Sequence, residues 1–151
     1  MNELPENILA MINEIAGGFD KLMGLRFVKA TPEEYVAELD VDERHLQPYG
    51  IVHGGVYSAT IETLCSLGAA LSVYSEGKSA VGLENSTSFL RAVRSGTIRC
   101  TARPVFAGKR SQVWEGQVTD DRERLIATGR VRLIILEQGS EADGIAVGLN
   151  R

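Results

Sequence analysis

Apolar and polar residues alternate in several short segments of the chain, a pattern typical of strands with one buried face. Between residues 35 and 42 the apolar side is formed by Tyr35, Ala37, Leu39 and Val41, and the polar side by Glu38, Asp40 and Asp42. Residues 97–106 and 124–136 alternate in the same way, and residues 24–30, 79–93 and 111–119 are also strand-like. The turns between the later strands are short, which favours an antiparallel meander.

Two other segments have a helical pattern. The first is a short amphipathic helix within residues 1–20, with Pro5 in its first turn. The second, Gly54–Ser75, is apolar nearly all round, as expected of a helix enclosed on most sides. Residues 43–52 predict a loop, and residues 139–151 form a glycine-rich tail that we expect to be irregular and flexible.

This order of elements predicts one α+β domain over residues 1–151, in which an antiparallel sheet is wrapped around one long central helix. The chain would leave the other face of the sheet uncovered, and that face would require a partner.

The composition limits the kinds of partner and functional site that the chain can have. The 151 residues contain 16 Lys and Arg against 20 Asp and Glu, a formal net charge of −4, which argues against a nucleic-acid platform. Two Cys and two His exclude a disulfide framework or a Cys/His metal cluster, so no metal is expected. The thiol count and the acidic first fifteen residues, which lack an export signal, indicate a cytoplasmic protein. Gly54–Ser75 is too polar for a membrane span, so no membrane contact is expected.

Glu62 is the only charged residue of the long helix. A lone buried carboxylate is costly unless it is paired, hydrogen-bonded or placed in a cleft. Ser58 and Ser66 lie four residues to either side and share its helix face, so a carboxylate and a hydroxyl could hold a water molecule. Glu62 is therefore either a catalytic carboxylate, or a structural one that pairs with an arginine on the sheet or reaches solvent between subunits.

His53, Gly54 and Gly55 open the same helix. Its first backbone N–H groups lack partners within the helix and lie at the positive end of the dipole, and glycines leave them accessible to a ligand oxygen. These N–H groups could stabilise an oxyanion, or the two glycines could serve only a tight turn.

The spacing between the two features has a consequence for assembly. Glu62 follows His53 by nine residues, a rise of about 13.5 Å on an ideal helix. The two cannot act on one bond within one chain, which predicts a homodimer with shared active sites and leaves open a further pairing into a tetramer.

Residues 47–57, Gln-Pro-Tyr-Gly-Ile-Val-His-Gly-Gly-Val-Tyr, together with Glu62, resemble the hot-dog-fold acyl-CoA thioesterases of the phenylacetate-pathway and 4-hydroxybenzoyl-CoA type. The resemblance covers about residues 20–137 and extends to residues 87–91, Thr-Ser-Phe-Leu-Arg. It is greatest to the branch that uses Glu where other branches use Asp.

The resemblance implies hydrolysis of a small aromatic acyl-CoA to the free acid and coenzyme A, which enters as part of the substrate, with no cofactor. Glu62 would be the nucleophile or general base, and the Gly54 N–H of the other subunit would polarise the thioester carbonyl. Gln47 and Ser66 would orient water or substrate, and His53 would anchor the loop rather than act as a base. The implied contacts to coenzyme A are Arg91, Lys109, Arg110 and Ser111.

Two other functions remain open. One is a hot-dog dehydratase acting on acyl-carrier-protein substrates, which the Gly-Gly pair after His53 disfavours. The other is a non-catalytic acyl-CoA-binding domain, which the Glu62/Ser66 pair disfavours. A nucleophilic Cys65 is disfavoured because no histidine is within reach on its own helix and buried cysteines usually pack as small hydrophobes.

Overall fold

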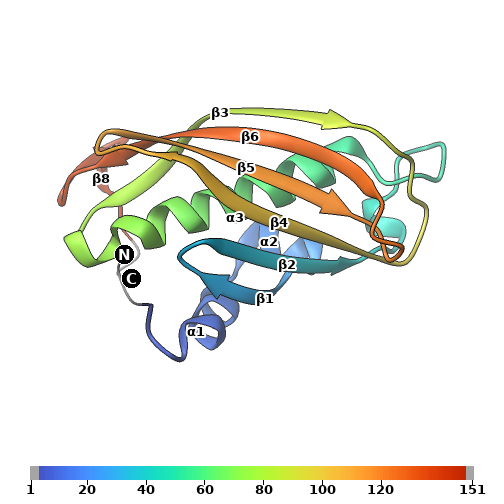
Figure 1. Cartoon of the computed structure of the whole chain (residues 1–151), viewed down its shortest axis with the longest axis horizontal. Helices are drawn as coiled ribbons and strands as arrows, with labels where there is room; N and C mark the ends of the chain where they lie inside the picture. Colours follow the sequence, from blue (N-terminus) through green and yellow to red (C-terminus); the bar gives the residue numbers. More distant parts are fainter. Residues whose placement is uncertain (1–3, 149–151) are drawn as a thin grey trace.

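The alternating segments form one six-stranded antiparallel sheet in a computed structural model that describes residues 4–148 (Figure 1). The strand order across the sheet is β1-β2-β4-β5-β6-β3. The strands are β1 (Arg26–Thr31), β2 (Glu34–Asp40), β3 (Ser79–Phe89), β4 (Thr97–Ala107), β5 (Ser111–Thr119) and β6 (Leu125–Leu136).

The position of β3 differs from a simple meander. Rather than pairing with β4, its neighbour in sequence, β3 pairs with β6 and forms one edge of the sheet. Residues 90–96 make the crossing, passing the start of the long helix, where the Val52 N–H donates to the Val93 carbonyl at 2.8 Å. Local alternation identifies a strand but not its neighbours, because pairing depends on the path of the whole chain.

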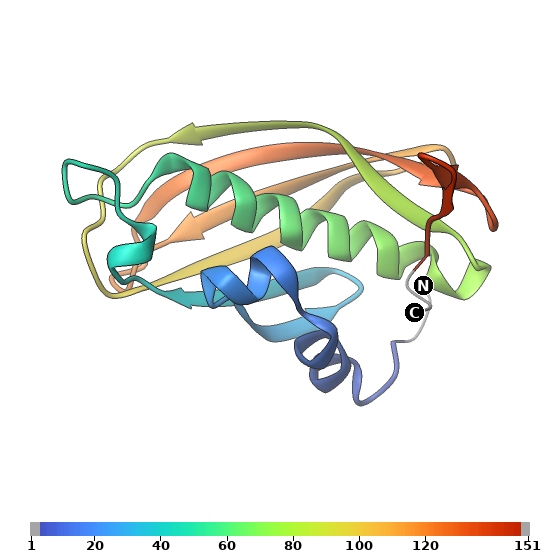
Figure 2. The same cartoon turned by 180° about the vertical axis from the view of Figure 1, so that it is seen from behind.

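The long helix α3 (Gly54–Val73) runs across the inner face of the sheet and packs against β3, β4, β5 and β6 (Figure 2). By length and composition this helix could cross a membrane, yet Ile61, Leu64 and Cys65 are fully buried against the sheet. The short η2 (Tyr74–Glu76) follows, and Gly77 ends it with a φ of +70°, a conformation that favours glycine. The predicted central helix is confirmed as the core of the fold.

Both terminal segments differ from the prediction within the described residues, and the parts of the predicted helix and tail at residues 1–3 and 149–151 lie outside them. The single helix expected within residues 1–20 is divided into α1 (Ile8–Ile15) and α2 (Gly18–Met23), because Gly17 is extended between them. Instead of an irregular tail after Gly139, strands β7 (Glu141–Ala142) and β8 (Ile145–Ala146) form a small hairpin. The Ser79 hydroxyl donates to the Val147 carbonyl beside it at 3.0 Å. The short η1 (Glu43–His45) likewise lies in the expected loop.

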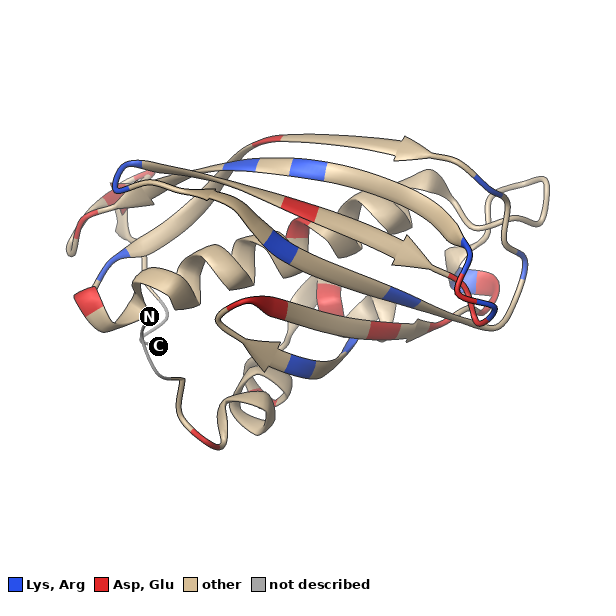
Figure 3. Cartoon of the chain, viewed as in Figure 1, with Lys and Arg blue, Asp and Glu red and all other residues tan. Residues whose placement is uncertain are grey.

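The strands of the sheet carry charged residues of both signs (Figure 3), and several of these form cross-strand ion pairs on the outer face. These pairs are Glu34–Arg103, Glu38–Arg99, Glu115–Arg130 and Glu84–Arg132. Paired charges of this kind are stable in water, and they lower the apolar share of this face. Exposed apolar side chains lie on and just after the edge strand β3, at Val81, Leu83, Phe89 and Leu90, and also on β4 and β6, at Val105, Phe106 and Ile134.

Candidate active site

The carboxylate of Glu62 lies in the middle of α3, half-buried and facing the edge strand β3. Its Oε1 accepts a hydrogen bond from the Ser66 hydroxyl at 3.2 Å, one helical turn away. Its Oε2 accepts from the Asn85 carboxamide at 3.0 Å. Gly82 of β3 lies against the same carboxylate, because a Cβ there would collide with Oε1. Neutral donors, rather than an arginine, therefore position this charge.

Asn85 is the part of this arrangement that sequence reasoning missed. Its Nδ2 donates to the Ser58 carbonyl as well as to Glu62, both at 3.0 Å. Its Oδ1 accepts from the Thr87 hydroxyl at 2.6 Å. The only signal in the sequence is the polar run of residues 84–88 within a strand, and nothing in that run shows that Asn85 faces the helix.

A cavity of about 560 Å³ opens beside Glu62 on the side away from β3. Glu62, Ser66 and Leu67 of α3 form one wall, and Ile12 and Ile15 of α1 line the space opposite. The carboxylate thus lies between a strand that holds it in place and a space that a substrate could enter.

The N-terminus of α3 presents one unpaired backbone donor. The Nδ1 atom of His53 caps the helix by accepting from the Gly55 N–H at 2.8 Å, which agrees with the anchoring role expected of His53. The Gly55 N–H is therefore occupied, contrary to the expectation of two accessible amides. The Gly54 N–H has no hydrogen-bond partner within residues 4–148. The Phe89 ring lies against Gly54, where a Cβ would come within 2.5 Å of it.

Gln47 lies in the loop before α3, at the end of the helix distant from Glu62. Its side-chain oxygen accepts from the Tyr49 N–H, and the guanidinium of Arg94 donates to the Tyr49 and Gly50 carbonyls at 2.9 Å each. Glu62 is the ninth residue after His53, along an uninterrupted helix. One chain therefore brings Glu62 and Ser66 together, but it keeps them apart from His53, Gly54 and the loop that contains Gln47.

The four residues expected to contact coenzyme A also form two groups. Lys109 and Arg110 form the turn before Ser111, which begins β5 near the C-terminal end of α3. Arg91 follows β3 near the N-terminal end of α3, where its N–H donates to the Ile126 carbonyl. Within one chain, Arg91 therefore lies at the opposite end of α3 from Lys109, Arg110 and Ser111.

Cys65 is fully buried in the core, and burial raises the pKa of its thiol far above the ordinary value. Since the thiolate is the nucleophilic form, this environment opposes covalent catalysis by Cys65.

Comparison with known proteins identifies the family of the chain. Residues 49–127 match the Thioesterase superfamily. The Mycobacterium tuberculosis protein Rv1847 is 45% identical over 121 residues, covering 79% of this chain and 86% of that protein. The 1,4-dihydroxy-2-naphthoyl-CoA hydrolase of Escherichia coli is 32% identical over 120 residues, covering 80% and 88%. A thioesterase structure from Haemophilus influenzae has a TM-score of 0.82 and 29% identity, covering 93% and 96% of the two chains.

The chain belongs to the Thioesterase superfamily and has its hot-dog fold. It is a thioester hydrolase, in agreement with the names of its relatives.

Proposed function

We propose that the protein hydrolyses small aromatic acyl-CoA thioesters, with Glu62 as the catalytic carboxylate. The observation that carries the proposal is the placement of Glu62, held by Ser66 and Asn85 at the wall of a cavity of about 560 Å³. The Escherichia coli relative is named as a hydrolase of an aromatic acyl-CoA, which supports an aromatic acyl group here.

In the reaction, a new C–O bond forms at the thioester carbonyl and the C–S bond breaks. As a general base, Glu62 takes a proton from water as the water oxygen attacks, and the departing coenzyme A thiolate recovers a proton. As a nucleophile, Glu62 forms an acyl anhydride that water then hydrolyses. In either case negative charge develops on the carbonyl oxygen, where an N–H donor stabilises it.

That N–H belongs to Gly54 of a second protomer in the proposed homodimer. The edge strand β3 supports this assembly: it is eleven residues long, mostly exposed and apolar at Val81, Leu83 and Phe89. A long exposed edge of this kind offers unpaired backbone groups to a second chain. Glu62 lies next to β3, so pairing at this edge would put a partner close to the carboxylate.

Arg91, Lys109, Arg110 and Ser111 are the proposed contacts to the phosphates of coenzyme A. Because Arg91 lies far from the other three within one chain, a single coenzyme A can reach both groups only if two protomers contribute.

The proposal is tested by measuring coenzyme A release from benzoyl-CoA by the wild type, Glu62→Gln and Glu115→Gln. Removing the carboxylate is expected to lower kcat by about 10²- to 10⁴-fold. Glu115, which pairs with Arg130 on the outer face, is the matched control for loss of one negative charge and should keep full turnover. Equal turnover by all three proteins would overturn the catalytic role of Glu62. Tight benzoyl-CoA binding without turnover by the wild type would favour the acyl-CoA-binding alternative.

A further inference from the structure

Residues 90–96, which cross from β3 to β4, run beside the loop that precedes α3 (Figure 1 and Figure 2). One nitrogen of the Arg94 guanidinium, Nη1, donates to the carbonyls of Tyr49 and Gly50 at the tip of this loop, at 2.9 Å each. A Cβ on Gly50 would come within 3.2 Å of the same nitrogen, so the absence of a side chain leaves room for the guanidinium. Arg94 thus holds two successive residues of the loop.

The Arg94 guanidinium has no competing carboxylate. It forms no ion pair within residues 4–148, unlike Arg103, which pairs with Glu34 on the outer face of the sheet. Arg94 therefore gives its donors to backbone carbonyls, and hydrogen bonds from a charged donor are stronger than those between neutral groups. The two carbonyls lie 45 and 44 positions away in the sequence, so these bonds fix the loop relative to the sheet.

The loop in turn fixes the side chain of Gln47. The Tyr49 N–H donates to Gln47 Oε1, and the Gln47 N–H donates to the Ile51 carbonyl at 2.9 Å. With Oε1 occupied, the Gln47 Nε2 is the side-chain atom without a hydrogen-bond partner within residues 4–148. The residue whose N–H holds Gln47 is thus also a residue whose carbonyl Arg94 holds.

We infer that Arg94 is a positioning residue that acts on thioester hydrolysis through Gln47. This inference rests on the proposed function and on the expected role of Gln47 in orienting water or substrate. An amide that orients a reactant must itself be fixed, because a misplacement of about 1 Å can cost about 10²-fold in rate. Loss of Arg94 releases only the tip of the loop, since the Val52 N–H still donates to the Val93 carbonyl at its base.

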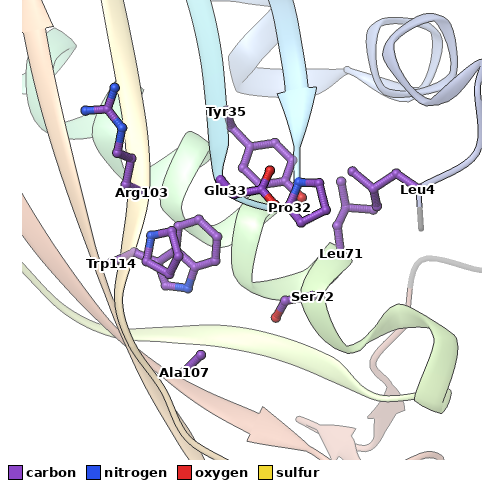
Figure 4. Close-up of a pocket in the computed structure, with 10 residues that line it drawn as sticks. Leu4, Pro32, Glu33, Tyr35, Leu71, Ser72, Arg103, Ala107 and Trp114 are labelled. Carbon is purple, nitrogen blue, oxygen red and sulfur yellow. The ribbon is translucent and has the colours of Figure 1, made fainter. Parts of the chain in front are cut away.

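The first test compares benzoyl-CoA turnover by the wild type, Arg94→Met and Arg103→Met. Arg103 is the matched control: it lies beside a cavity that Leu71 lines, near the other end of α3, and Figure 4 shows its guanidinium directed away from that cavity. We expect kcat to fall about 10- to 100-fold in Arg94→Met, with KM changed less than about threefold, and to stay unchanged in Arg103→Met. Equal kcat in the three folded proteins would overturn the inference.

A double-mutant cycle with Gln47→Ala separates positioning from a general structural role. Because Arg94 acts through Gln47, Arg94→Met should lower kcat in the wild-type background but by less than about twofold when Gln47 is already alanine. The same factor in both backgrounds would make Arg94 a structural residue only. Wild-type kcat in Gln47→Ala would also overturn the inference, since Arg94 would then have nothing to position.

Arg94→Lys replaces Arg94→Met in this cycle if the latter does not fold. Lysine keeps a charged donor but not the planar guanidinium, so kcat should fall by a smaller factor, again only where Gln47 is present. The Glu62→Gln variant distinguishes this inference from the proposed function. Equal benzoyl-CoA turnover by Glu62→Gln and the wild type means that the proposed function fails, whereas an inactive Glu62→Gln beside a fully active Arg94→Met means that only the role of Arg94 fails.

Discussion

The middle of α3 and its N-terminus present two different kinds of functional group. In the middle, a side-chain carboxylate is held by a hydroxyl on its own helix and a carboxamide on β3. At the N-terminus, the His53 side chain occupies the Gly55 N–H and leaves the Gly54 N–H unpaired beside the Phe89 ring. The position of a side-chain carboxylate depends on hydrogen-bond donors from neighbouring residues. The backbone of the helix itself holds the N–H groups at its N-terminus in place. The two regions can therefore be disturbed separately.

After loss of the Glu62 carboxylate itself, deleting the backbone donor at the N-terminus of α3 should have the largest effect. Gly54→Pro removes the N–H at the first helical position, where proline suits the helix, and the extended backbone of His53 is compatible with a following proline. Gly54→Ala is the matched control, because it also adds a Cβ against Phe89 but keeps the N–H. We expect kcat for benzoyl-CoA to be about 10²- to 10³-fold lower in Gly54→Pro than in Gly54→Ala. Similar rates in the two variants would show that the N–H is not used.

Combining a Glu62→Gln subunit with a Gly54→Pro subunit in one dimer should restore activity if Glu62 of one subunit acts with Gly54 of the other. Glu62→Gln and Gly54→Pro homodimers are each expected to be nearly inactive. In a hybrid dimer, one of the two sites combines an intact Glu62 with an intact Gly54. Half of randomly paired dimers are hybrids, so about a quarter of wild-type activity should return after co-refolding equal amounts. No recovery, despite hybrid formation confirmed by native mass spectrometry, would contradict the shared site.

Asn85 is predicted to be a positioning residue for Glu62, with a smaller effect. Asn85→Leu should lower kcat about tenfold with little change in KM, because the carboxylate loses one donor. Asn85→Asp places a second negative charge beside Glu62, and like charges disfavour ionisation. The acid limb of the pH–rate profile should therefore move to higher pH in Asn85→Asp. A profile identical to that of the wild type would limit Asn85 to a structural role.

The smallest expected effect is in η1, which supports the loop before α3 through the hydrogen bond from the His53 N–H to the His45 carbonyl. Hydrogen bonds from the Arg44 side chain lower the pKa of Asp42 to about 2. Because this pKa lies below the unfolded value, the interaction stabilises the fold above about pH 4 and is lost as the pH falls toward 2. In Arg44→Gln, NMR titration should show the pKa of Asp42 returning toward about 3.9. If the pKa of Asp42 stayed near 2 in Arg44→Gln, neighbours other than the Arg44 side chain would be responsible for lowering it.

The sequence predicted the strands well, because one face of each is buried by the same core. Tyr35, Ala37 and Leu39 are all buried as the alternation required, while Asp40 is exposed. The pattern failed at the end of β4, where Phe106 is exposed after a bulge near Pro104 that shifts the register. An inserted residue shifts the alternation of side chains by one position, so the apolar positions beyond the bulge no longer face the core.

For the site, the sequence by itself determined the local groups: a lone carboxylate one turn from a hydroxyl, and a histidine followed by two glycines at the start of a helix. Such features depend only on helical periodicity and end effects, which are local. Only the tertiary structure decided that Asn85 holds Glu62 and that Phe89 covers Gly54. These contacts join segments tens of residues apart, and their geometry depends on how β3 packs against α3.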